Sequence, residues 1–208
     1  MNAKFFGKTT AIAAAAAMMM SMAACSGGSM DDSNSSAGAA SGNTITLGSI
    51  TTNSGTAAAY GEAELKGFKL AISEINAKGG LNGKKIKLES MDDKGDATEA
   101  SNAFNKLAGD NSVLAVLGPT ISSTTAAVAP LADQSKLPAI APAATSDSIA
   151  TGGYLFRTCF KDSYQGEIAA KFAAETLKVK KVAVLYGTGD PYSSGVGKAF
   201  AAAAKKAG

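Results

Sequence analysis

Histidine and tryptophan are absent from this chain of 208 residues, and it contains only two cysteines. Without histidine, the commonest general base and the commonest metal-binding side chain are missing. The sequence also lacks a Gly-x-Ser-x-Gly nucleophile elbow, which an α/β hydrolase would need. We therefore expect a protein that is not an enzyme and that uses neither a metal nor a cofactor.

Long runs of charge are absent as well. The formal net charge is +3, and it falls to +1 without Lys4 and Lys8. A near-neutral chain with no long basic run has no electrostatic footprint for nucleic acid. The glycine-rich segment Tyr186–Tyr192 is no nucleotide fingerprint either, because Tyr192 stands where the third glycine is required. The sequence therefore predicts no nucleic-acid partner and no nucleotide cofactor.

The N-terminus carries an export signal. Lys4 and Lys8 precede an uncharged, largely apolar stretch, residues 9–24, that ends in Met-Ala-Ala before Cys25. This order is typical of a secretory signal peptide, and the stretch is shorter than the ~20 apolar residues of a membrane span. The ending resembles the lipobox of bacterial lipoproteins, whose cysteine is acylated after cleavage. We expect residues 1–24 to be removed and Cys25 to anchor the protein to a membrane; an ordinary signal peptide is the alternative.

Residues 25–43 are predicted to be a flexible linker. After Cys25 they are almost entirely Ser, Gly, Ala, Asn and Asp. Such a segment cannot bury enough apolar surface to offset the entropy lost on ordering. With Cys25 acylated, Cys159 has no partner for a disulfide, and we expect it to be a small buried residue rather than a nucleophile.

From Thr44 onward, short β-rich runs alternate with helical periods. Apolar residues spaced three and four apart, from Leu65 to Ile75, predict a helix that ends at Gly79-Gly80. We expect strands at 45–50, 85–92, 113–117, 137–140, 155–157 and 181–186, and further helices at 96–107, 122–134, 163–177 and 192–206. This alternation predicts an α/β fold with a mostly parallel sheet and helices on both faces.

The chain ends within an Ala- and Lys-rich helical segment, residues 198–208. An α/β unit needs a further strand after such a helix. We interpret the sequence as a truncated piece of a longer protein, and the alternative is a small protein whose last helix frays.

Loops that follow strands are the first candidates for a ligand site, because ligands bind beyond the carboxyl ends of parallel strands. The loop Gly118–Thr125 opens a helix, whose N-terminus and hydroxyl groups would attract a carboxylate. Equally, Ser122 or Ser123 could serve only as the helix cap. The loop Ala141–Ser146 combines small residues with a hydroxyl, although it could be a plain proline turn.

A series of short runs then occurs in a fixed order: Tyr60-Gly61, Ile75–Gly83 (INAKGGLNG), Asp92-Asp93, Gly118–Thr125, Pro142–Thr145, Phe156-Arg157 and Asp190–Gly197. Together they resemble the solute-binding proteins of branched-chain amino-acid ABC transporters, over the whole stretch from Thr44 to Gly208. The resemblance implies a type I periplasmic-binding-protein fold with two doubly wound parallel-sheet lobes. Residues 44–160 would form the first lobe, and residues 161–208 would begin an incomplete second lobe.

The resemblance also implies ligand contacts. Ser122 would bond the carboxylate and ammonium groups of an amino acid, and the Ala143 backbone and Thr145 hydroxyl would complete this polar grip. Tyr60 would line the side-chain pocket, and Tyr192 would reach in from the second lobe. The predicted ligand-binding set is Tyr60, Ser122, Ser123, Ala143, Ala144, Thr145 and Tyr192.

The function implied by the resemblance is that of a monomeric, extracytoplasmic lipoprotein. It would capture an amino acid, branched-chain by preference, and deliver it to the permease of an ABC importer. The paired cysteines of the family are replaced here, with Gly95 and Ile121 near those places. The resemblance also implies that the remaining contacts of the second lobe, including an acidic residue facing the ammonium, would lie beyond Gly208. The ligand therefore stays open: proteins that bind amides, urea or aromatic acids, and ligand-sensing domains of the same fold, are alternatives.

Replacing the cysteine of the expected lipobox tests the anchor. Cys25→Ser should abolish incorporation of labelled palmitate and release the protein from the membrane fraction, because serine offers no thiol for acylation. Cys159→Ser is the matched control and should leave both properties unchanged. Palmitate that remained in the Cys25→Ser protein would disprove the lipoprotein interpretation.

Overall fold

The computed structural model of the chain describes residues 42–149 and 153–206, so that Cys25, the expected signal peptide and most of the expected linker lie outside the described residues. Its strands are β1 (Thr44–Thr51), β2 (Lys85–Asp92), β3 (Val113–Leu117), β4 (Ala139–Ala141) and β5 (Leu155–Arg157). Its helices are α2 (Ala58–Ala77), α3 (Ala97–Ala108), α4 (Ser122–Ser135), α5 (Asp162–Lys171), the π-helix η1 (Phe172–Thr176) and α6 (Pro191–Lys206). Among these helices, none is long and apolar enough to cross a membrane.

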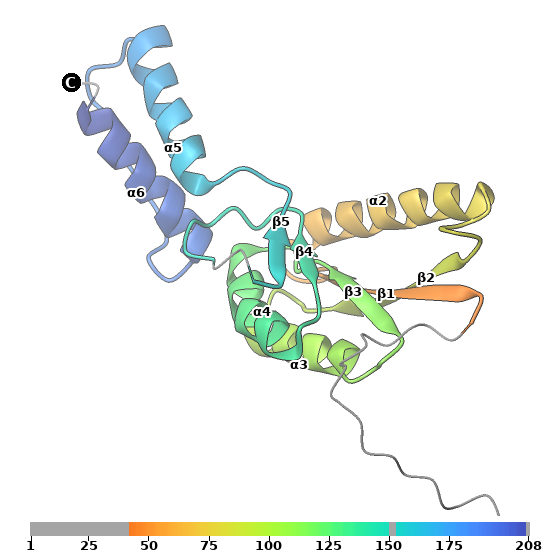
Figure 1. Cartoon of the computed structure of the whole chain (residues 1–208). Helices are drawn as coiled ribbons and strands as arrows, with labels where there is room; N and C mark the ends of the chain where they lie inside the picture. The colour runs from red at the N-terminus through yellow and green to blue at the C-terminus, as the bar shows by residue number, and fades with distance from the viewer. Residues whose placement is uncertain (1–41, 150–152, 207–208) are drawn as a thin grey trace, which may run out of the picture. The chain divides into compact units, whose positions relative to one another are not determined.

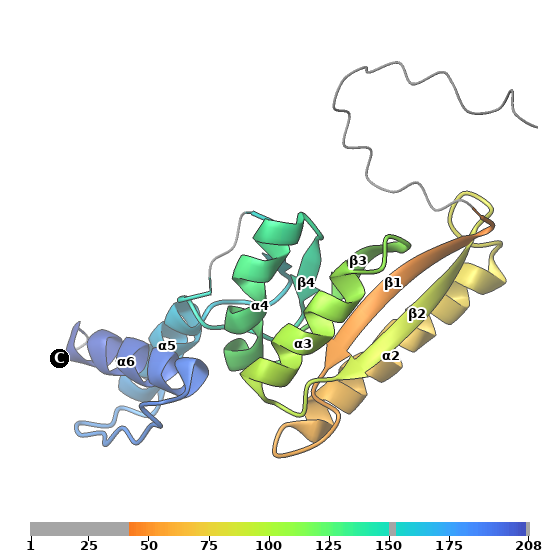
Figure 2. The ribbon, with the colours of Figure 1, turned by 90° about the horizontal axis from the view of Figure 1, so that it is seen from below.

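The strands form one parallel sheet in the order β2-β1-β3-β4-β5. Helix α2 lies on one side of this sheet, and α3 and α4 lie on the other (Figures 1 and 2). This arrangement confirms the predicted α/β fold with helices on both faces. The strand order reverses between β1 and β3, and in such sheets the crevice beyond this reversal is where ligands bind.

The core lies between the sheet and the α3–α4 layer. Phe104 and Leu107 of α3 are fully or almost fully buried there, with Val116 of β3 and Val128 of α4. Gly48 of β1 allows this packing, because a Cβ at that position would lie 2.7 Å from Leu107 Cδ1. On the opposite side, α2 buries only one residue, a glycine, so that the apolar stripe expected on this helix is half-covered.

Two turns have the geometry that their glycines predict. Shortly after the end of helix α2, Gly79 and Gly80 have φ values of +104° and +85°. Asn82 and Gly83 also have positive φ, and Leu81 and Lys84 exchange two backbone hydrogen bonds across them. This is a two-residue turn of the kind that favours Asn-Gly, and it leads the chain into β2.

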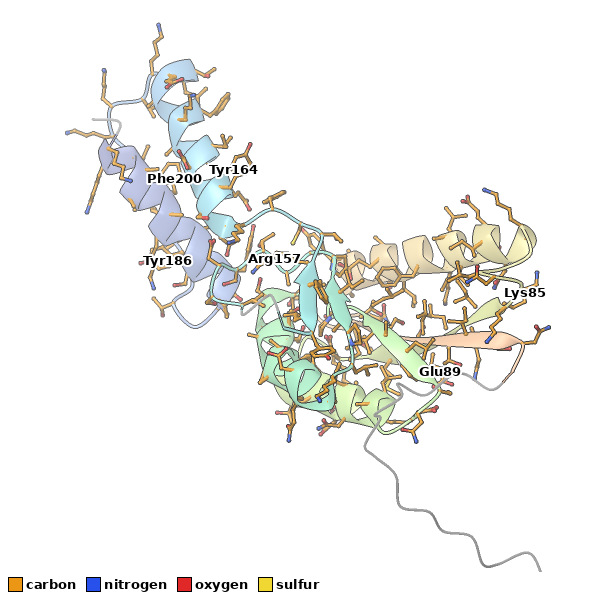
Figure 3. All side chains as sticks on the ribbon, in the orientation of Figure 1. Lys85, Glu89, Arg157, Tyr164, Tyr186 and Phe200 are labelled. Carbon is orange, nitrogen blue, oxygen red and sulfur yellow. The ribbon has the colours of Figure 1, made fainter. Side chains whose placement is uncertain are left out.

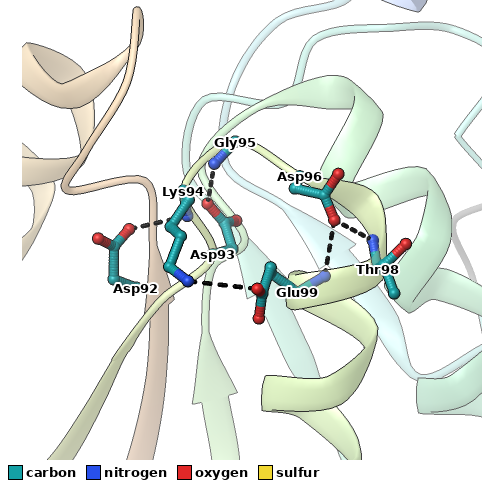
Figure 4. Close-up of polar contacts among 7 residues, drawn as sticks. All are labelled: Asp92, Asp93, Lys94, Gly95, Asp96, Thr98 and Glu99. Carbon is teal, nitrogen blue, oxygen red and sulfur yellow. Dashed lines mark hydrogen bonds and ion pairs between the residues drawn. The ribbon is translucent and has the colours of Figure 1, made fainter.

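The loop between β2 and α3 supplies the side-chain cap of α3 (Figure 4). The Asp96 carboxylate accepts hydrogen bonds from the backbone N–H groups of Thr98 and Glu99, at 2.8 and 2.9 Å. The Glu99 carboxylate does not return to Asp96; it pairs with Lys94 Nζ at 3.2 Å. One carboxylate therefore caps α3, while the other ties the helix to the preceding loop.

The last part of the chain differs from the sequence prediction. Residues 181–186 were expected to form a strand but have no strand pairing in the structure. A strand needs a neighbour for its backbone groups, and no described segment pairs with this one. Val182, Val184 and Leu185 are accordingly exposed, Leu185 completely. The expected helix at 163–177 also changes character, because its last turns form the π-helix η1.

A buried hydrogen-bond network joins the loops at the carboxyl edge of the sheet. Thr120, after β3, donates from Oγ1 to Glu64 Oε2 of α2 at 2.7 Å, and its Oγ1 accepts from the Thr52 backbone N–H at 3.1 Å. Thr52 in turn donates from its hydroxyl to Asp93 Oδ1, after β2, at 2.6 Å. The loops after β1, β2 and β3 are thereby held together. Burial raises the pKa of the Glu64 carboxyl above its ordinary value.

Neutralising Glu64 tests this network in the full-length protein. The pKa of Glu64 is raised in the folded state, so the folded protein binds this proton more tightly than the unfolded chain does. The contribution of Glu64 to the free energy of unfolding therefore falls as the pH rises from below the ordinary carboxyl pKa to above the raised one. Glu64→Gln keeps an acceptor for Thr120 and should be at least as stable as the parent at pH 7, with a smaller difference at pH 4. Urea unfolding at the two pH values measures this, with the exposed Glu62→Gln as control. A Glu64→Gln protein that is less stable at pH 7 would mean that the network requires the charge.

Candidate functional site

The loops after β3 and β4 are joined at the carboxyl edge of the sheet. Ser122, the first residue of α4, is 4% exposed, and its Oγ accepts a hydrogen bond from the Ser146 backbone N–H at 3.2 Å. The N-cap residue of α4 is Ile121, whose side chain has no acceptor atom. Neither predicted serine is therefore the cap of this helix, which removes the alternative interpretation of Ser122 and Ser123. The positive end of α4 is left without a capping side chain beside the hydroxyl of Ser122.

The loop after β4 contains an unpaired hydroxyl. Ala144 and Thr145 are buried, Ala143 is half-buried, and Thr145 Oγ1 has no hydrogen-bond partner among the described residues. Buried hydroxyl groups are nearly always paired. The unpaired Thr145 hydroxyl lies in a loop at the carboxyl edge of the sheet, where it could donate a hydrogen bond to a polar ligand atom or accept one from it.

Arg157, at the end of β5, fixes the shape of this loop from one side (Figure 3). Its Nη1 donates to the carbonyl oxygens of Ala144 and Ser146, at 3.3 and 2.9 Å, and its Nη2 donates to that of Ile149 at 3.2 Å. Three carbonyl groups are thus held by one planar guanidinium. The shape of the loop is therefore fixed by contacts within the chain.

Asp162, the first residue of α5, lies against the same loop. Its backbone N–H donates to the Thr145 carbonyl at 3.0 Å. The side chain is fully buried, and neither carboxylate oxygen has a hydrogen-bond partner in the described part of the chain. Burial raises the pKa of this carboxyl, and the Asp147 charge adds to the rise, while the Thr145 hydroxyl and the Arg157 guanidinium oppose it.

Helix α6 covers the Asp162 carboxylate. A Cβ at Gly195 would lie 2.5 Å from Asp162 Oδ2, so that this position accepts no side chain in the present packing. One turn earlier on the same helix lies Tyr192, which is 43% exposed and whose hydroxyl accepts from Gln165 Nε2 at 3.5 Å. The carboxylate therefore lies between the loop after β4 and the first turns of α6.

The structure brings together only part of the predicted set. Ser122 is joined to the loop of Ala143–Thr145 by its hydrogen bond with the Ser146 backbone N–H. Ser123, the next residue of α4, is half-buried. Tyr60, on the first turn of α2, is 68% exposed and, like Tyr192, has no hydrogen bond to these loops within the described residues. The roles assigned to the seven residues stay predictions.

Sequence reasoning missed Arg157 and Asp162 as site residues. Arg157 was recognised only as part of a family-like run, and nothing in its local pattern indicates that it binds three carbonyl groups of a distant loop. Asp162 has a weak signal, since an acidic residue in the first turn of a helix is ordinarily explained by the helix dipole. Its burial could be found only from the fold.

Metal binding and thiol chemistry have no support in the described residues. They contain no group of three or more His, Cys, Asp or Glu side chains placed to hold a metal ion. Cys159 is half-buried and unpaired, and burial raises the pKa of its thiol. A raised pKa keeps the thiol protonated at neutral pH, which agrees with the expectation that Cys159 is not a nucleophile.

Comparison with known proteins places this geometry in a family. The periplasmic binding protein family matches residues 44–208. The Leu/Ile/Val-binding protein BraC3 of Rhizobium johnstonii is 36% identical over 160 residues, which are 76% of this chain and 43% of that protein. The chain thus spans less than half the length of the curated relatives that it matches.

Solved structures have the same fold. The branched-chain amino acid transporter substrate-binding protein LivJ of Streptococcus pneumoniae, in complex with isoleucine, matches with a TM-score of 0.75 and 40% identity, over 78% of this chain and 47% of that one. A solute-binding protein of an ABC transporter from Rhodopseudomonas palustris, in complex with 3,4-dihydroxybenzoic acid, matches with a TM-score of 0.73 and 27% identity, over 80% and 45%. The parallel sheet, the site at its carboxyl edge and these matches lead to one conclusion: the chain belongs to the periplasmic binding protein family, with the type I fold.

Proposed function

We propose that the full-length protein is an extracytoplasmic substrate-binding protein that captures a branched-chain amino acid and delivers it to an ABC importer. Residues 44–160 would supply most of one lobe and residues 161–208 the beginning of a second, with the ligand held between them. Cys25 would carry the lipid that keeps the protein at the membrane. The protein would act as a monomer and would catalyse no reaction.

The observation that carries this proposal is the group of unpaired polar atoms at the loop after β4. Thr145 Oγ1 and both carboxylate oxygens of Asp162 are buried without partners in the described structure. An ionised carboxylate in such a position is costly unless a cation joins it. An ammonium group has three donors, and a ligand ammonium placed here would satisfy Asp162 and Thr145 together.

The same site offers a place for a carboxylate. The uncapped N-terminus of α4 and the Ser122 hydroxyl lie on the neighbouring loop, which Ser146 links to the Thr145 loop. A positive helix end favours an anion. Adjacent subsites for a carboxylate and an ammonium fit the main-chain groups of an α-amino acid.

An aromatic acid, as in the Rhodopseudomonas palustris neighbour, fits this arrangement less well. Such a ligand has a carboxylate but no ammonium, so that it would leave Asp162 buried and unpaired. An amide or urea donates hydrogen bonds but brings no positive charge. The charge of Asp162 therefore favours an amino acid over the other ligand classes.

Removing the Thr145 hydroxyl tests the polar grip. A hydrogen bond to a charged group contributes about 1.5–3 kcal/mol, so Thr145→Ala in the full-length protein should weaken leucine binding by about tenfold to a hundredfold. Isothermal titration calorimetry measures the change, with the exposed Thr158→Ala as control. An unchanged affinity would mean that the loop is only a turn.

Removing the Asp162 charge tests the ammonium subsite. Asp162→Asn should weaken leucine binding by at least about tenfold, because the ligand ammonium loses its charged acceptor. Binding of 4-methylpentanoate, which is leucine without its ammonium group, should stay equal or improve. Glu167→Gln, an equivalent change at an exposed position of α5, is the control. If both ligands weakened equally, Asp162 would have a structural role and the preference for amino acids would lose its basis.

A further inference from the structure

The first turn of α5 is capped by a residue from the ligand-site loop. The N-cap residue of α5 is Lys161, whose side chain has no acceptor atom and makes no capping hydrogen bond. Instead, the carboxylate of Asp147 accepts from the Ser163 backbone N–H at 2.7 Å and from the Ser163 hydroxyl at 2.9 Å. Asp147 lies two residues after Thr145 on the loop that follows β4.

A second contact reinforces the attachment. The Asp162 backbone N–H donates to the Thr145 carbonyl oxygen at 3.0 Å, so that two successive N–H groups of the first helical turn are bonded to the loop. Helices ordinarily satisfy such groups with the side chain of their own N-cap residue. Here the helix start and the ligand loop are fixed to one another.

The other side of the loop is fixed to the sheet. Arg157, at the end of β5, donates to three carbonyl groups of the segment Ala144–Ile149, and Ser146 is bonded to Ser122. The loop is therefore hydrogen-bonded both to the sheet and to the start of α5. Only four residues, Thr158–Lys161, join β5 to α5 along the chain.

We propose that Asp147 is a positioning residue for ligand capture: its bonds to Ser163 hold the start of α5 against the loop of Thr145 and act as the pivot on which the second lobe closes. This inference rests on the proposed binding function. Without the Asp147 bonds, α5 and the helix packed on it would sample more orientations, and the fraction of molecules able to close would fall. The apparent affinity for a ligand falls in proportion to that fraction.

The test separates positioning from capping in the full-length protein. Asp147→Ala should weaken leucine binding about fivefold to tenfold, the range expected from a lost N-cap interaction, and lower the melting temperature. Adding Lys161→Asp supplies a cap from the helix itself. In the double variant the melting temperature should recover while the leucine affinity stays low. Asp96→Ala, which removes the cap of α3, should lower the melting temperature and leave the affinity unchanged.

Recovery of the affinity in the double variant, or no loss of affinity in Asp147→Ala, would overturn the proposal, since Asp147 would then be only a helix cap. A second measurement needs no ligand. Spin labels at Lys69 of α2 and Lys198 of α6, with Cys25 and Cys159 replaced by serine, should give a broader distance distribution in the double variant than in the parent. An unchanged distribution would also overturn the proposal. If the parent protein bound no leucine, the proposed function would fail and the spin-label distances would still decide the role of Asp147.

Discussion

Parallel pairing of β1 with both β2 and β3 is the constraint on which the rest of the structure depends. Together with the parallel pairing of β4 and β5, it places the carboxyl ends of the described strands at one edge of the sheet, where the loops must accommodate several polar residues in a small space. Glu64, Thr120, Thr52 and Asp93 meet there because their elements converge. The α3–α4 layer supplies the apolar burial, with Phe104 fully enclosed, and leaves this edge to polar groups.

Around the loop after β4, the groups that hold the loop are paired and two candidate ligand groups are not; in the network of Thr52 and Thr120, Glu64 Oε1 and Asp93 Oδ2 also have no partner in the described chain. The groups that hold the loop after β4 are paired: Arg157 with three carbonyl groups, Ser146 with Ser122, and Asp147 with Ser163. The Thr145 hydroxyl and the Asp162 carboxylate lie among these contacts and remain unpaired within the described chain. An unpaired buried polar group costs more than a typical hydrogen bond contributes, so these two side chains are the ones for which the proposed function supplies a partner. Under that proposal, the ammonium group of an amino acid is the partner.

Local patterns predicted the elements of the sheet well. Strands β2, β3 and β5 have the predicted bounds, and α4 and α6 begin within one residue of their predicted starts, since apolar periodicity and turn residues are both local properties. Strand β4 begins two residues later than expected. The prediction of a strand at 181–186 was wrong for this structure. The backbone groups of a strand need a neighbouring strand to pair with, and no described segment provides one. A pattern of side chains indicates the tendency to form a strand, and the partner decides whether one exists.

The sequence by itself determined the fold class and indicated two candidate loops, whose role in binding stays a prediction. The alternation of strands and helices and the runs around Ser122 and Thr145 are properties of neighbouring residues, and they suffice to predict a fold class and a candidate location. The tertiary structure alone decided that Arg157 shapes the second loop, that Asp162 is buried against Thr145, and that Asp147 caps a helix sixteen positions away. These contacts join residues that no local pattern relates, because burial and pairing arise only when separate elements pack together.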